Sequence, residues 1–156
     1  MAANRVWKEY KELTKEVAKN GSDREISLAP VDDASIFEWK ASITGPPDTP
    51  FADAKFELML KVPETYPHVP PQATFVTKVF HPNVHFKTGE ICLDILKQNW
   101  SPAWTLHSVC RAIIALLSDP DPSSPLNCDA GNLIRNGDER GYLSMAKMFT
   151  EMHASR

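Results

Sequence analysis

Two runs of alternating apolar and polar residues, separated by a proline-rich segment, constrain the fold more than any other feature. The first run buries alternate positions at Phe37, Trp39, Ala41 and Ile43. The second repeats the pattern at Phe56, Leu58, Leu60 and Val62. A period of two residues is typical of strands with one buried face. Residues 45–50, with one glycine and three prolines, predict a turn between them. A further strand is expected over 73–78, so the pattern predicts an antiparallel meander.

Helical periodicity flanks the strands on both sides. An amphipathic helix over residues 5–19 is expected to turn four side chains to the core, namely Val6, Tyr10, Leu13 and Val17. A second helix carries Leu106, Val109, Cys110, Ile113 and Leu117, with Thr105 as its cap and Pro120 after its end. A third, opened by Asp138 and Glu139, carries Tyr142, Met145, Ala146, Phe149 and Met152. The order of helix, strands and helices indicates an α+β fold.

Length and charge exclude several classes of protein. The 156 residues fit one domain, which we expect to span 1–156. A net charge of −3 gives no reason to expect nucleic acid as a partner. No apolar run is long enough to cross a membrane, and the N-terminus lacks a signal-peptide core, so we expect no direct membrane insertion. The three cysteines lack zinc or disulfide spacing, which favours a soluble protein in a reducing compartment.

The segment 80–105 has little regular pattern and contains the side chains best suited to chemistry. Long irregular segments in compact domains are usually functional or disordered, and Trp100 and Trp104 argue for order. Within it, Cys92 follows Asn83 after a short loop. A thiol is a good carrier of acyl groups, and an amide N–H can stabilise the oxyanion formed when such a group moves. By itself, however, a cysteine between apolar neighbours is more often a small buried hydrophobe.

Other readings of the cysteines and histidines are weaker. His81 and His85 lie near Cys92, but no protease signature surrounds the thiol, and His-Pro-Asn is a good turn former. We therefore expect His81 to bond backbone rather than act as a base. A metal site made of these three side chains would lack a paired-ligand motif, so we expect no metal. Cys110 is expected in the core, and a structural role is favoured for Cys128.

Several motifs, in this order and at compatible spacing, resemble the ubiquitin-conjugating enzymes over nearly the whole chain. They are Gly45-Pro46 with Thr49-Pro50, Tyr66-Pro67 with Pro70-Pro71, His81-Pro82-Asn83, and the runs 89–96 and 100–104. The runs 83–90, 101–106 and 124–135 resemble the peroxisomal branch, the conjugating peroxin that acts in recycling the import receptor. The resemblance implies the ubiquitin-conjugating fold: an N-terminal helix, a four-stranded antiparallel meander and C-terminal helices.

The resemblance also implies an activity and its residues. Cys92 would accept ubiquitin from an activating enzyme as a thioester and pass it to a lysine, or in the peroxisomal branch to a cysteine of the import receptor. Asn83 matches the asparagine credited with supporting the oxyanion or ordering the loop, and His81 and Pro82 complete its structural motif. Asp94 and Ser124 match positions that line the active-site cleft. Many relatives carry an acid in place of Ser124, which suggests that thiol acceptors react more readily than lysine.

Partner surfaces follow from the same resemblance. Arg5, Lys8 and Lys11 match positions that meet the activating enzyme, although a solvated face with Glu9, Glu12 and Glu16 as counter-charges explains them equally well. The loop that touches RING-type ligases is matched by Ser101, Pro102 and Ala103. His68 matches the companion loop, where many relatives have an aromatic or aliphatic residue.

The resemblance implies no cofactor. It implies a cytosolic enzyme that a membrane-anchored peroxin recruits to the cytosolic face of the peroxisomal membrane. Two alternatives stay open. One is a catalytically silent binding module of the same fold, which the presence of Cys92 and Asn83 disfavours. The other is a conjugating enzyme for a different small modifier.

Overall fold

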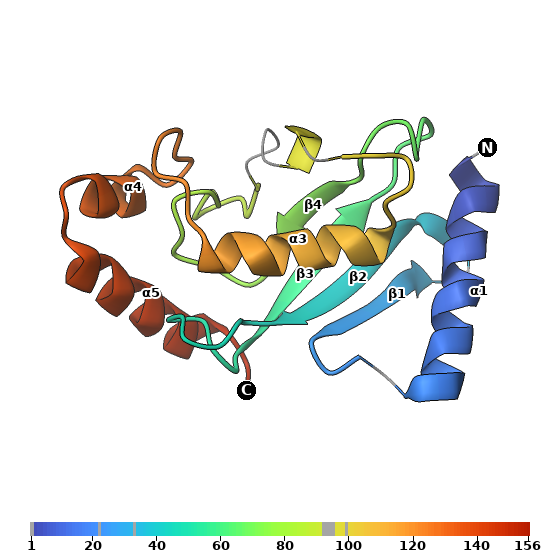
Figure 1. The fold of residues 1–156 in the computed structure, drawn as a ribbon, viewed down its shortest axis with the longest axis horizontal. Coiled ribbons are helices and arrows are strands. Elements are labelled where there is room, and N and C mark those ends of the chain that lie inside the picture. The colour runs from blue at the N-terminus through green and yellow to red at the C-terminus, as the bar shows by residue number, and fades with distance from the viewer. Residues whose placement is uncertain (1, 22, 33, 92–95, 99) are drawn as a thin grey trace.

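A four-stranded antiparallel sheet in the order β1-β2-β3-β4 forms the centre of the molecule, which confirms the predicted α+β meander. The computed structural model describes residues 2–21, 23–32, 34–91, 96–98 and 100–156. The strands are β1 (Ile26–Asp32), β2 (Ser35–Thr44), β3 (Lys55–Lys61) and β4 (Gln72–Phe75). The helices are α1 (Ala2–Asn20), α3 (Leu106–Ser118), α4 (Cys128–Arg135) and α5 (Glu139–His153). Helix α1 lies at one end, and α4 and α5 at the other (Figure 1).

The predicted alternation sets the register of the central strands. Ala41 pairs with Leu58 and Ile43 with Phe56, and all four side chains are buried. The prediction was wrong for Phe37, which is 37% exposed. The register between β1 and β2 shifts at this place, because three residues of β2 lie opposite a single residue of β1. Such a bulge re-aims the side chains around it, so Ile36 faces the core instead.

Helix α3 packs on one face of the sheet and begins as predicted. Thr105 is its N-cap, and Thr105 and Ser108 form a reciprocal capping box. The apolar stripe that contains Cys110 and Ile113 is buried, which confirms the predicted core face. By contrast, Val17 on α1 is 49% exposed, so its predicted place in the core was wrong. Residues 14–20 are all exposed, so the last turns of α1 lie outside the core.

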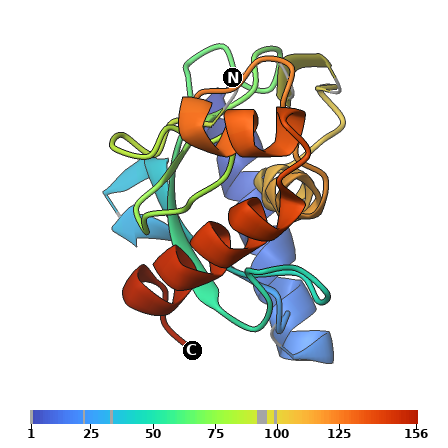
Figure 2. The ribbon, with the colours of Figure 1, turned by 90° about the vertical axis from the view of Figure 1, so that its left-hand side faces the viewer.

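Helices α4 and α5 form a unit beside the loop that follows α3. Figure 2 shows α5 crossing this end of the molecule with α4 next to it. Asp138 caps α5 as predicted, and Tyr142 and Ala146 turn to the core. Among the residues that the structure describes, no helix is both long and apolar enough to cross a membrane.

Candidate active site

The segment His81-Pro82-Asn83 is buried, and both ring nitrogens of His81 form hydrogen bonds. The backbone N–H of Asn83 donates to Nδ1 of His81 at 3.0 Å. Nε2 therefore carries the ring proton and donates to the carbonyl oxygen of Leu116 in α3 at 2.9 Å. Burial lowers the pKa of His81 to about 4, although the bond to Leu116 opposes this shift. The imidazole is neutral at pH 7 and bonds backbone as predicted, so it offers no base.

The Asn83 side chain is engaged by the loop that follows α3. Its Oδ1 accepts the backbone N–H of Asp121 at 2.8 Å, and its Nδ2 donates to the carbonyl oxygen of Asp121 at 2.8 Å. Asn83 is 1% exposed, so these bonds satisfy an amide that is removed from water. Sequence reasoning missed Asp121, because only its backbone takes part and a backbone group leaves no residue-type signal.

Two further bonds fasten this loop to the same segment. The carbonyl oxygen of Pro82 accepts the backbone N–H groups of Leu126 and Asn127, at 2.8 and 3.1 Å. The hydroxyl and the backbone N–H of Ser123 donate to the Asp121 carboxylate and lower its pKa. Ser124 lies in this loop and is exposed. The structure thus joins predicted residues from two distant segments, Asn83 and Ser124, into one region.

A tight hairpin leads from Asn83 toward the predicted nucleophile. Val84 pairs with Ile91, and Gly89 adopts φ +77° at the turn. A Cβ atom on Gly89 would lie 1.9 Å from the carbonyl oxygen of Phe75, so the backbone approach requires glycine. Cys92 and Asp94, which the sequence predicts as nucleophile and cleft residue, lie outside the described residues.

The other two thiols differ in environment. Cys110 is fully buried in α3, and burial raises the pKa of its thiol to about 12, as expected for a core residue. Cys128 is exposed at the first residue of α4.

His85, the other histidine near the predicted nucleophile, has a structural role in the hairpin. Its Nδ1 accepts the backbone N–H groups of Lys87 and Thr88, so this ring organises the hairpin turn. Within the ranges that the structure describes, no three His, Cys, Asp or Glu side chains are grouped to hold a metal ion.

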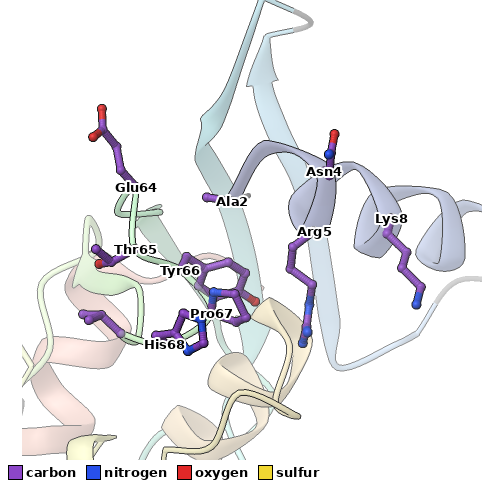
Figure 3. A pocket seen from close by; sticks show the side chains of 10 residues that line it. Ala2, Asn4, Arg5, Lys8, Glu64, Thr65, Tyr66, Pro67 and His68 are labelled. Atoms are coloured by element: carbon purple, nitrogen blue, oxygen red, sulfur yellow. The ribbon is translucent and has the colours of Figure 1, made fainter.

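Three of the predicted partner residues, Arg5, Lys8 and His68, line a pocket of about 790 Å³ (Figure 3). Arg5 and Lys8 leave α1 on one side of this pocket, and the loop with Tyr66, Pro67 and His68 forms the other side. Lys8, His68 and Lys11 are exposed. The peptide bond between Tyr66 and Pro67 is cis.

The Arg5 side chain forms two hydrogen bonds within the protein, whereas the sequence predicted an exposed, partner-binding or solvated side chain. Its Nε bonds the Glu9 carboxylate at 3.0 Å, and its Nη2 donates to the carbonyl oxygen of Trp104 at 2.8 Å. Glu9 is buried, so its interpretation as a solvated counter-charge was wrong. The predicted ligase loop lies beside this pair: Pro102 and Ala103 are exposed, and Ser101 is half-buried.

The sequence model of a family described as "Ubiquitin-conjugating enzyme" matches residues 5–150. "Protein PEROXIN-4" of Arabidopsis thaliana is 60% identical over 150 residues, which are 96% of this chain and 93% of the relative. "Ubiquitin-conjugating enzyme E2 pex4" of Dictyostelium discoideum is 57% identical over 151 residues, with coverage of 97% and 98%. The crystal structure of H. polymorpha ubiquitin conjugating enzyme Pex4p, in complex with the soluble domain of Pex22p, matches with a TM-score of 0.89 and 38% identity, covering 99% of each chain.

Proposed function

The chain belongs to the ubiquitin-conjugating enzyme family, and from that membership we propose that it carries ubiquitin as a thioester on Cys92. It is a transferase of the peroxin-4 type. The observation that carries the proposal is the family match over residues 5–150, which spans both Asn83 and the loop bonded to it. We expect residues 1–156 to act as one catalytic domain.

Transfer requires two exchanges at one carbonyl carbon. In the first, the Cys92 thiolate attacks the thioester between ubiquitin and the activating enzyme, whose thiolate leaves and takes up a proton. In the second, an acceptor amine or thiol attacks the new thioester, loses its proton, and displaces the Cys92 thiolate. An ordinary cysteine has a pKa of about 8.5, so some thiolate is present near neutral pH without help from a base. Cys92 therefore needs no histidine base, in agreement with the neutral, fully bonded ring of His81.

Asn83 acts first by holding the loop that carries Ser124. Its carboxamide oxygen and one N–H are bonded to the backbone of Asp121. A carboxamide has two N–H groups, so one remains for the oxyanion of either tetrahedral intermediate. The short bonds to Asp121 support loop ordering as the principal role, and the second N–H adds oxyanion support.

Ser124 sets a preference for thiol acceptors. Its hydroxyl cannot take the proton of an attacking lysine as a carboxylate could. A cysteine acceptor, with an ordinary pKa of about 8.5, needs less help near neutral pH than a lysine of about 10.4. We expect charged protein to discharge faster to free cysteine than to free lysine, and Ser124→Asp to narrow the difference. A clear lysine preference in the wild type would contradict this role.

The acceptor is a cysteine or lysine of the peroxisomal import receptor during its recycling. The support is the likeness to relatives named for peroxin-4. The Pex4p of H. polymorpha was crystallised with the soluble domain of Pex22p. We expect a membrane-anchored peroxin to hold this enzyme at the cytosolic face of the peroxisomal membrane.

The exposed residues of α1, of the His68 loop and of the loop 101–103 receive the other partners. Lys8 and Lys11 on α1 meet the activating enzyme. His68 and the loop 101–103 meet a RING-type ligase whose pocket accepts an imidazole rather than an apolar side chain. The exposure of Lys8, Lys11, His68, Pro102 and Ala103 supports this assignment.

A charging assay tests the proposal. The protein is incubated with activating enzyme, ATP and ubiquitin, and the product is resolved with and without a thiol reductant. We expect a higher-mass band that the reductant removes, retained in the control Cys128→Ser and lost or made thiol-resistant in Cys92→Ser. A thiol-sensitive band in Cys92→Ser, or none in the wild type, would exclude the carrier role. Parallel reactions with other small modifiers test the choice of ubiquitin, and reactions with a candidate anchor test recruitment.

A further inference from the structure

The residues proposed to meet partners, namely Lys8, Lys11, His68 and the loop 101–103, are called the partner-binding face. A buried carboxylate, that of Glu9, lies beneath this face and has no part in the proposed acyl transfer. The Glu9 side chain is 4% exposed and accepts three hydrogen bonds. Its Oε2 accepts from Nε of Arg5 at 3.0 Å and from the Tyr66 hydroxyl at 2.5 Å. Its Oε1 accepts the backbone N–H of Leu106 at 2.8 Å. Three donors thus engage both carboxylate oxygens of one buried side chain.

The three donors come from three separate segments. Arg5 belongs to α1, Tyr66 to the loop that carries His68, and Leu106 is the first residue of α3. The first N–H groups of a helix carry partial positive charge, so a carboxylate at this end of α3 is well placed. Glu9 is therefore the common anchor of α1, the His68 loop and the start of α3.

Secondary bonds extend the same anchor to the predicted ligase loop. Nη2 of Arg5 donates to the carbonyl oxygen of Trp104, directly after residues 101–103. The Trp100 indole N–H, directly before them, donates to the carbonyl oxygen of Pro67 at 2.9 Å. Both ends of this loop are thereby tied to the segments that Glu9 holds.

Stability alone does not require this arrangement. Replacement of a buried ion pair by well-packed apolar residues is often neutral or stabilising. A carboxylate on α1 with directional bonds to two other segments instead fixes the relative positions of all three, because each bond constrains both distance and angle.

We propose that Glu9 is a positioning residue for the partner-binding face. It holds Lys8 and Lys11 on α1 in a fixed relation to His68 and to the loop 101–103, so that the activating enzyme and the ligase meet one rigid surface. The inference rests on the proposed function, because it assigns these segments to those partners. It places Glu9 outside the acyl-transfer chemistry, so its loss changes partner recognition and leaves the reactivity of the thioester unchanged.

Initial rates of thioester formation, measured against the concentration of this protein, test the proposal. Glu9→Gln keeps the size of the side chain and can still accept from Leu106, but it loses the charge that pairs with Arg5. We expect its KM for charging to rise about fivefold to tenfold, the effect of about 1 to 1.4 kcal/mol of lost interface energy. The maximal charging rate, and the ligase-free discharge of purified thioester to free cysteine, stay at wild-type values. Glu16→Gln is the matched control, because it removes the same charge from an exposed position of the same helix, and it keeps the wild-type KM.

Three outcomes overturn the inference. The first is an unchanged KM in Glu9→Gln. The second is a parallel fall in ligase-free discharge, which would indicate general loss of structure. The third is that the wild type forms no thioester. This outcome would also exclude the proposed function, whereas the first two outcomes would leave the proposed function intact. Should Glu9→Gln fail to fold, Tyr66→Phe decides: it deletes one donor, and it should raise the same KM by a smaller factor, whereas an unchanged KM would overturn the proposal.

Discussion

Replacement of Asn83 by alanine separates the two roles that its carboxamide can play. The change removes both 2.8 Å bonds to the backbone of Asp121. A typical hydrogen bond contributes about 0.5–1.5 kcal/mol net, so we expect the free energy of unfolding to fall by about 1–3 kcal/mol. The lower part of this range is favoured, because Asp121 is exposed and water can satisfy its freed backbone groups.

The two roles differ in what else changes. If Asn83 mainly orders the loop, the alanine variant loosens residues 119–127, and the KM for a small acceptor rises. The Asp121 amide, which donates to Oδ1 of Asn83, would then exchange its hydrogen faster. If Asn83 mainly supports the oxyanion, the maximal discharge rate falls by about a hundredfold, equivalent to about 3 kcal/mol, while the loop stays ordered.

Three measurements on one sample decide between them: single-turnover discharge to free cysteine at several concentrations, hydrogen exchange at Asp121, and urea unfolding. Asn127→Ala is the control for general destabilisation. It removes another buried amide nearby, the cap of α4, at a cost of about 1 kcal/mol. A hundredfold loss of maximal rate in Asn83→Ala, with Asp121 protection and stability unchanged, would refute loop ordering as the principal role.

Three further predictions concern stability. Burial lowers the pKa of His81 from 6.5 to about 4, so the unfolded chain binds more protons than the folded chain between these pH values. The free energy of unfolding should therefore fall by about 3 kcal/mol in total as the pH drops through this window. Urea unfolding at pH 7 and at pH 4.5 should show a larger loss of stability in the wild type than in His81→Asn, and equal losses would count against this prediction. Gly89→Ala should lower the free energy of unfolding in urea by clearly more than Gly137→Ala. Both glycines have positive φ, but only a Cβ atom at position 89 would meet Phe75. Equal losses in the two variants would show that the close approach of Gly89 to Phe75 is unimportant. Tyr142→Phe should alter stability by less than about 0.5 kcal/mol or raise it, since this buried hydroxyl has no hydrogen-bond partner among the described residues; a loss above about 1 kcal/mol by thermal unfolding would reveal a partner.

The central strands β2 and β3 and helix α3 were predictable because their signals are local. A period of two residues in β3 and a capped apolar stripe in α3 depend only on neighbours in the sequence. Strand β1 and helix α4 gave no comparable signal. In β1 only Ile26 is buried, and Pro30 lies within the strand. Helix α4 has eight residues and buries only Ala130 and Gly131, although Asn127 is a recognisable cap.

Candidate site residues could be named from the sequence where a residue type carries the chemistry, and not where distant segments meet. Helical spacing places Glu9 with other acidic residues on a polar face. Its burial follows from Tyr66 and Leu106, which lie far along the chain. The same limit applies to Asp121, whose backbone binds Asn83 across 38 positions. Motif resemblance found Asn83 itself, but the sequence left its two roles undecided.

The separation of 38 positions between Asn83 and Asp121 also bears on the order of folding. Closing a long loop costs entropy before its contacts form, so these bonds are expected late, once α3 has docked on the sheet. The thiol of Cys92 exists in every partly folded chain, but the loop bonded to Asn83 is in place only in the complete fold. On the proposed function, a newly made chain carries the Cys92 thiol from synthesis but gains the loop bonded to Asn83 only in the complete fold, so an incompletely folded molecule would have little capacity for premature transfer.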